Sequence, residues 1–157
     1  MRKSSFFVAA GVLAVLVTAS VAVAARATHA RLAASVTIKS RTVAPYGKIL
    51  VTSAGRTIYM FVPDKQSKVS CNRTCQAVWP PVKASKGEKL VGTDGVKRSL
   101  LKMDKNPLGG YVVTYNRWPL YTYAADTAPG QAKGQGLNST GGFWYVLSVS
   151  GAVIKKK

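Results

Sequence analysis

One short motif occurs twice in this chain, and an internal repeat constrains a fold more than most other sequence features do. Residues 55–64 read GRTIYMFVPD, and residues 117–126 read RWPLYTYAAD. In each copy an aliphatic residue precedes a tyrosine, a second aromatic residue stands two positions later, and an aspartate follows three positions after that. The motif side chains are Tyr59, Phe61 and Asp64 in the first copy and Tyr121, Tyr123 and Asp126 in the second. We therefore expect a domain built from two related halves.

The segments around both copies are typical of β-structure. Residues 36–41 alternate apolar and polar side chains, which predicts a strand. Two runs rich in β-forming residues, 47–52 and 57–62, flank a short turn and predict a hairpin. The second copy repeats this pattern at 110–115 and 120–124.

The two copies align at an offset of 62 residues, which gives repeats at 47–82 and 110–147 within a domain spanning 35–154. We predict a mainly β fold, in which two antiparallel β-hairpin repeats pack as a small sandwich or barrel-like domain with one short helix. Residues 83–105 predict mostly loop, with one short strand or helical turn. Residues 128–142 are rich in glycine and predict a long loop.

The motif residues have a structural and a functional interpretation. Side chains two positions apart on a strand share a face, so Tyr59 and Phe61 can form an aromatic ladder that packs against its counterpart from the other half. An aspartate at the end of such a strand can accept backbone N–H groups and fix the following loop. Alternatively, exposed tyrosines beside Asp64 and Asp126 could bind a sugar, an aromatic ring or a cation. The two carboxylates could also serve glycoside chemistry if they shared one exposed cleft.

Cys71 and Cys75 are the only cysteines, and their C-x-x-x-C spacing places them in a predicted short helix at 71–78 with Ser70 as its N-cap. In an exported chain the pair is expected to form a disulfide. Cysteines four positions apart on a regular helix are somewhat too far apart for a disulfide, so we expect the helix to be distorted.

The alternative for the cysteine pair is redox or metal chemistry, with help from Met60 or Met103. The single histidine, His29, lies in or beside the segment expected to be removed. The remaining chain therefore has no imidazole for a catalytic triad or a metal site. We predict no cofactor and no catalytic residue.

The N-terminus has the pattern of an export signal. A positive start precedes an uncharged, largely apolar run at 6–25, and small residues follow it in an A-x-A arrangement. We interpret residues 1–27 as a cleaved signal peptide or an uncleaved membrane anchor, and residues 28–34 as a tether. Both interpretations place the remainder outside the cytoplasmic membrane.

The chain is strongly basic, with 23 Lys and Arg against 5 Asp and Glu. After residue 30 the balance is 20 against 5, a net charge of +15, and residues 155–157 form a basic tail. Such an excess attracts polyanionic partners, and the alternative interpretation is a soluble domain from a lineage or habitat with a general basic bias. In an exported protein these partners are an anionic cell-wall polymer or a phospholipid surface rather than nucleic acid.

Several segments together resemble a known bacterial family. They are GKILVTSAGRTIYMFVPD, SCNRTCQAVWPP, PLYTYAAD, GQGL and GGFWYVLSVSG, which lie between residues 47 and 151. The family is the "secreted repeat of unknown function", whose members are described as predicted lipoproteins with a Tyr-x-aromatic-x-x-Asp motif. The resemblance implies an envelope protein with a repeated β unit and a short helix carrying the cysteine pair, and it implies no catalytic residues.

We therefore expect an exported cell-envelope protein, most simply a non-catalytic binding or structural module that associates with anionic envelope components. The alternative is an extracellular redox or metal-handling protein that uses the cysteine pair.

Overall fold

The computed structural model describes residues 34–64 and 68–156, which belong to one compact unit, Leu32–Lys157. The predicted signal peptide or anchor at 1–27 lies outside the described residues, as does the predicted tether except for residue 34. Among the described residues, none forms a helix with the length and apolar character needed to cross a membrane.

The described residues form ten strands, one α-helix and two short 3-10 helices. The strands are β1 (Ser35–Val43), β2 (Gly47–Thr52), β3 (Tyr59–Phe61), β4 (Lys83–Ala84), β5 (Lys89–Gly92), β6 (Leu101–Lys105), β7 (Tyr111–Tyr115), β8 (Trp118–Pro119), β9 (Asn138–Ser139) and β10 (Gly142–Val146). The helices are η1 (Val62–Asp64), α1 (Arg73–Val78) and η2 (Arg98–Leu100). The predicted mainly β fold with one short α-helix is confirmed.

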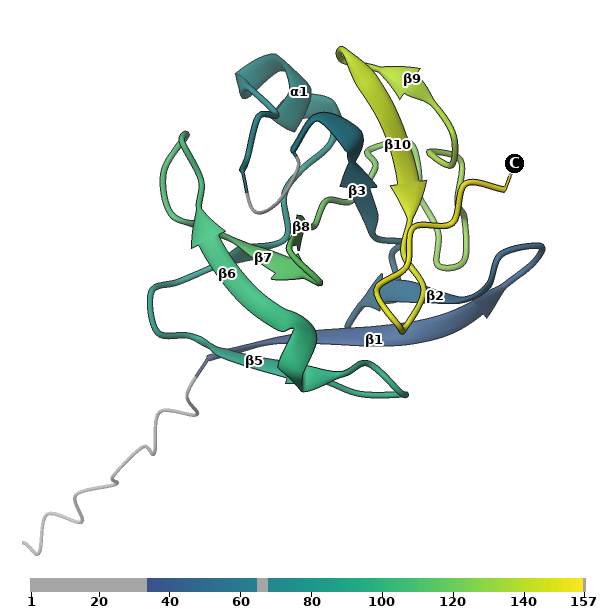
Figure 1. The fold of residues 1–157 in the computed structure, drawn as a ribbon, viewed down its shortest axis with the longest axis horizontal. Helices are drawn as coiled ribbons and strands as arrows, with labels where there is room; N and C mark the ends of the chain where they lie inside the picture. Colours follow the sequence, from purple (N-terminus) through teal and green to yellow (C-terminus); the bar gives the residue numbers. More distant parts are fainter. Residues whose placement is uncertain (1–33, 65–67, 157) are drawn as a thin grey trace, which may run out of the picture. The chain divides into compact units, whose positions relative to one another are not determined.

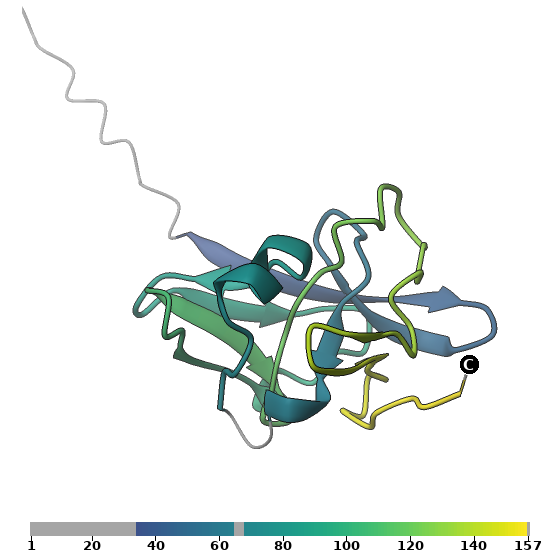
Figure 2. The same ribbon diagram turned by 90° about the horizontal axis from the view of Figure 1, so that it is seen from above.

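The strands form three small sheets (Figures 1 and 2), ordered β2-β1-β5, β3-β10-β9 and β4-β7-β6, with β8 paired to β7. Within the described chain they do not close into a barrel. Most pairs are antiparallel, as predicted, but β5 lies parallel to β1.

The two halves exchange strands instead of folding separately. The chain that returns from β2 pairs with it only at the bridge between Val51 and Thr57. It then continues as β3, which pairs with β10 of the other half. In the second half the chain returns from β7 through β8 and then reaches Tyr121, which bridges Pro81 of the first half.

The last strand of each half lies against the hairpin of the other half. The β4 strand pairs with β7, and the Val113 N–H donates to the Val82 carbonyl at 2.8 Å. In the equivalent position of the first hairpin, the Leu50 N–H donates to the Leu147 carbonyl at 3.0 Å. The halves are therefore interlocked, and each completes the backbone hydrogen bonding of the other.

The exchange buries β3 on both faces. Met60 points into one apolar cluster with Leu50, while Tyr59 and Phe61 point together into a second cluster. This alternation confirms that the two aromatic side chains share one face.

The structure corrects three local predictions. The α1 helix begins at Arg73, with Asn72 rather than Ser70 as its N-cap, because the Asn72 side chain accepts the Cys75 N–H at 3.0 Å. Cys71 therefore lies before the helix, and the predicted distortion is not needed to bring the two cysteine Cα atoms to 5.3 Å. The segment 83–105, predicted as mostly loop, contains three strands, β4, β5 and β6.

Two further predictions are corrected in the same way. The predicted loop at 128–142 contains the short strand β9, which pairs with β10. The predicted hairpins are shorter than expected, since β3 leaves the first hairpin to pair with the other half of the domain.

Candidate functional site

The repeated tyrosine of each half is hydrogen bonded to the repeated aspartate of the other half. The Tyr59 hydroxyl donates to Asp126 Oδ2 at 2.6 Å. The Tyr121 hydroxyl donates to Asp64 Oδ2 at 2.5 Å. The backbones of the two tyrosines also pair directly, with N–H to carbonyl distances of 2.8 and 2.9 Å. The two copies of the motif thus meet around a pseudo-twofold axis.

The second oxygen of each carboxylate fixes the loop that follows it. Asp64 Oδ1 accepts the Ser70 N–H and the Ser70 hydroxyl, both at 2.7 Å. Asp126 Oδ1 accepts the Lys133 N–H at 2.9 Å. Both aspartates are fully buried, so these bonds supply the partners that a buried carboxylate requires. They also show the predicted loop-fixing interaction.

Burial controls the protonation of this network. Burial raises the pKa of Asp64 above its usual 3.8, although bonds from Tyr121 and Ser70 act in the opposite direction. Burial also raises the pKa of Tyr59 and of Tyr121 well above the usual 10.0, and their aspartate partners raise it further. Both phenols therefore keep their protons and act as donors at neutral pH.

Four aromatic rings form a stack that crosses the same pseudo-twofold axis between its two central rings. In order they are Phe61, Trp144, Trp79 and Tyr123. The two central indoles are parallel within 2°, with centroids 3.9 Å apart, and each outer ring lies 4.2 Å from its neighbour. Tyr59 meets Trp79 edge-on at 5.4 Å, and Tyr121 meets Trp144 edge-on at 5.2 Å. The aromatic ladders of the two halves pack together, as the structural interpretation predicted.

This burial decides what the motif can do chemically. Tyr59, Tyr121 and both aspartates have no exposed surface, Phe61 is 3% exposed, and only Tyr123 is partly accessible. The exposed cleft that glycoside chemistry requires is therefore not formed by the two carboxylates. Their contacts hold the two halves together.

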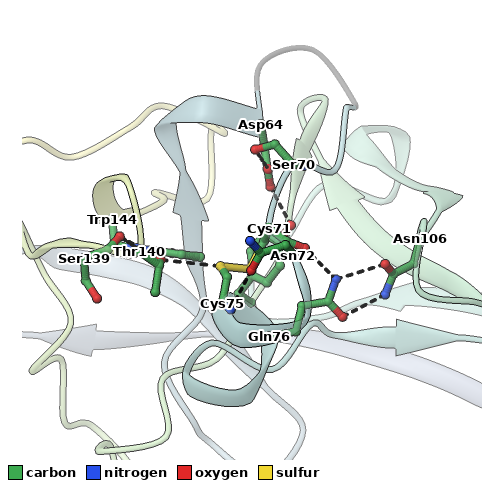
Figure 3. The surroundings of a disulfide bond; sticks show 11 residues. Asp64, Ser70, Cys71, Asn72, Cys75, Gln76, Asn106, Ser139, Thr140 and Trp144 are labelled. Carbon is green, nitrogen blue, oxygen red and sulfur yellow. Dashed lines mark hydrogen bonds between the residues drawn. A yellow bond between two sulfur atoms is a disulfide. The ribbon is translucent and has the colours of Figure 1, made fainter.

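The cysteine pair forms the predicted disulfide, Cys71–Cys75, at the start of α1. Both residues are buried, at 3% and 2% exposure, and the Thr140 hydroxyl lies 3.5 Å from Cys75 Sγ (Figure 3). Within the described residues, no three His, Cys, Asp or Glu side chains gather closely enough to hold a metal ion.

The described residues line surface cavities that are candidate binding sites, and two of them are considered in turn. One, of about 190 Å³, lies beside the turn after β2 and includes Lys39, Arg41 and Asp94 in its lining. The other, of about 260 Å³, lies between α1 and the loop from β6 to β7 and includes Arg73 and Lys83. Neither cavity contains a residue of the repeated motif.

Sequence reasoning missed the crossing of the Tyr–Asp pairs and the second cavity. A sequence signal for Tyr–Asp pairing exists, since a buried tyrosine hydroxyl needs a hydrogen-bond acceptor. Each copy of the motif carries one such tyrosine, Tyr59 or Tyr121, and one aspartate that can accept the bond. A signal for the cavity is lacking, because Arg73 and Lys83 belong to segments whose contact depends on the strand exchange.

Comparison with protein-family models gives a match. A model described as "secreted repeat of unknown function" matches residues 40–83 and 102–148, so each matched segment includes part of the strand before the predicted hairpin. Neither the comparison with curated proteins nor the comparison with solved structures finds a match.

Proposed function

The chain belongs to the family of secreted repeats of unknown function, and from this premise we propose that it is a non-catalytic module that associates with anionic components of the cell envelope. The outer face of the cytoplasmic membrane and the cell wall are the sites where an exported basic protein meets such polymers and lipids.

The distribution of the few acidic residues supports this proposal most strongly. Of the five Asp and Glu residues, Asp64 and Asp126 are fully buried. A third, Asp94, lies 4.0 Å from the Lys39 ammonium group, which offsets its charge. The fold thus removes negative charge from the surface while the lysines of β2, β5 and β6 stay exposed, and the surface is more cationic than the composition alone indicates.

Sedimentation with lipid vesicles tests the proposal. The chain from residue 34 onward should bind phosphatidylglycerol vesicles at about 0.1 M salt and be released at about 1 M, since the Debye length falls from about 10 to about 3 Å. Vesicles of phosphatidylcholine are the neutral control and should not retain the protein. Binding that is equal at both salt concentrations, or equal on both lipids, would contradict electrostatic association.

A further inference from the structure

We propose that the cavity between α1 and the β6–β7 loop is a discrete site for a phosphodiester group with a short polyol linker. This inference deepens the proposed function and rests on it for its biological meaning, because it names the chemical group that the basic surface would recognise.

The walls of the cavity are held in place by an amide pair. Gln76 Nε2 donates to Asn106 Oδ1, and Asn106 Nδ2 donates to Gln76 Oε1, both at 3.0 Å (Figure 3). Gln76 Nε2 also donates to the Cys71 carbonyl at 2.9 Å, which connects the pair to the disulfide. Asn106 Oδ1 further accepts the Leu108 N–H at 3.1 Å. The cavity therefore needs little rearrangement to receive a ligand, which lowers the entropic cost of binding.

The cationic side chains of this cavity are uncompensated. Arg73 and Lys83 line it and are exposed, and neither has an ion pair among the described residues. The lining that the structure describes includes no carboxylate. The other cavity differs, because Asp94 lines it and lies near Lys39. In that cavity the carboxylate of Asp94 already offsets part of the positive charge that would attract an anion. In the cavity beside α1 the full positive charge of Arg73 and Lys83 is available.

The shape and composition indicate the class of anion. A guanidinium can donate two parallel hydrogen bonds to a phosphate and an ammonium adds a point charge, so Arg73 and Lys83 suit a phosphoryl group. Ala77 and Leu108 supply an apolar edge, and Leu108 is 41% exposed. That edge suits the carbon chain between successive phosphates. A volume of about 260 Å³ accommodates one such unit.

A titration with glycerophosphoglycerol, a soluble phosphodiester with a glycerol on each side of the phosphate, followed by amide NMR shifts, tests the site. We expect saturable shifts concentrated at Gln76, Leu108 and Gly109. The double variant Arg73→Gln/Lys83→Gln should weaken binding by about tenfold or more, because it removes charge-assisted bonds. The control Lys48→Gln/Lys86→Gln loses the same charge from exposed positions outside the cavity and should bind nearly as well as the parent. All variants should retain the parent melting temperature, since only exposed side chains change.

Shifts spread over the whole basic surface, or equal losses in the two double variants, would overturn the site while leaving salt-sensitive vesicle binding intact. Conversely, amide shifts confined to the cavity, without vesicle binding, would support the site and contradict the proposed association with a phospholipid surface.

The source of the phosphodiester is distinguished by two further measurements. Binding of a soluble glycerol phosphate polymer and of phosphatidylglycerol vesicles is compared between the two double variants. The source that the cavity recognises is the one whose binding falls more in Arg73→Gln/Lys83→Gln than in the charge-matched control. If the two double variants lose binding equally, both on the polymer and on the vesicles, the proposed site is overturned.

Discussion

Asp64 and Asp126 each accept a phenol from the opposite repeat and a backbone N–H from their own. A buried carboxylate without partners is costly, so every bond in this network matters to stability. Each carboxylate therefore has two roles. Its Oδ2 joins the two repeats, and its Oδ1 fixes the loop that follows it.

A double-mutant cycle should detect the crossed pairing. Tyr59→Phe leaves Asp126 Oδ2 without its phenol donor and should lower the free energy of unfolding by about 1–3 kcal/mol, the usual cost of leaving a buried polar atom without its partner. Combined with Asp126→Asn, it should be clearly non-additive in urea unfolding, as residues in direct contact are. Combined with Asp64→Asn from its own repeat, it should be additive within about 0.5 kcal/mol. A strong coupling of Tyr59 to Asp64, with additivity between Tyr59 and Asp126, would contradict the crossed pairs.

The raised pKa of Asp64 predicts a pH dependence. Because burial lifts its folded pKa above the unfolded 3.8, the folded chain holds this proton more tightly than the unfolded chain. The stability of the parent should therefore decrease as the pH rises from about 4 through the raised pKa, relative to Asp64→Asn, which does not titrate there. Urea unfolding of both proteins between about pH 4 and about pH 7 measures this difference. A constant difference would contradict it.

Part of this network was predictable from the residues. The spacing of Tyr59 and Phe61 placed both rings on one buried face, and the position of Asp64 after the strand indicated an acceptor for backbone N–H groups. Which tyrosine reaches which aspartate was not predictable, since spacing along one copy gives no information on the path of the other.

At the scale of elements, the loop between β8 and β9 approaches the aromatic stack so closely at Gly134 that no side chain fits there. A Cβ atom added at Gly134 would lie 2.7 Å from the Trp79 ring and 3.0 Å from the Tyr59 ring. The Gly134 N–H also donates to the Tyr59 hydroxyl at 3.2 Å. The loop after β8 therefore passes close against the edge of the Trp79 ring, where a side chain would displace the ring.

Gly134→Ala should therefore destabilise the fold by about 1–3 kcal/mol, as overpacking of a core does. Gly87→Ala is the control, because it has a positive φ of 76° but no atom within 4 Å of the added Cβ. It should cost only about 1 kcal/mol of backbone strain. Thermal or urea unfolding compares the two, and an equal or smaller loss in Gly134→Ala would contradict the close approach.

The disulfide should act as a structural crosslink. Closing so short a loop stabilises by about 2 kcal/mol in the chain-entropy model, so Cys71→Ser/Cys75→Ser should lower the free energy of unfolding by about that amount. Vesicle binding should be retained, because the exposed lysines do not depend on this bond. Loss of vesicle binding by a variant that remains folded would favour a functional role for the cysteines.

The strands of 83–105 show why part of the element pattern escaped prediction. The two-residue β4 is shorter than a recognisable hydrophobic alternation, and the four-residue β5, KLVG, does not alternate apolar with polar side chains. Each exists because a distant partner, β7 or β1, supplies its hydrogen bonds. Longer strands such as β2 carried their own signal and were found at their correct bounds.

At the scale of the whole molecule, the halves are not independent folding units. Both β3 and β4 from the first half find their partners in the second half, and Leu50 is bonded to Leu147. The sequence revealed the duplication but not this exchange, because a repeat indicates similar halves without indicating whether they exchange strands.

Separating the halves tests the interlocking. We expect that a chain ending after Gly95 and a chain starting at Val96 form no folded monomers, since each lacks partners for its exchanged strands. Mixing them should restore β-structure as a one-to-one complex, measured by circular dichroism and sedimentation. A folded, monomeric half would contradict the exchange.

The crossed hydroxyl–carboxylate contacts bear on how such a molecule arises. In a chain with only one copy of the unit, the tyrosine and the aspartate could form these crossed hydrogen bonds only with a second molecule. Such a chain would therefore form these contacts as a pair of identical subunits. Tandem duplication of such a gene would join the pair in one polypeptide and would free the two copies to diverge. The two copies differ in this way, since the first carries the cysteine crosslink and the second has no cysteine.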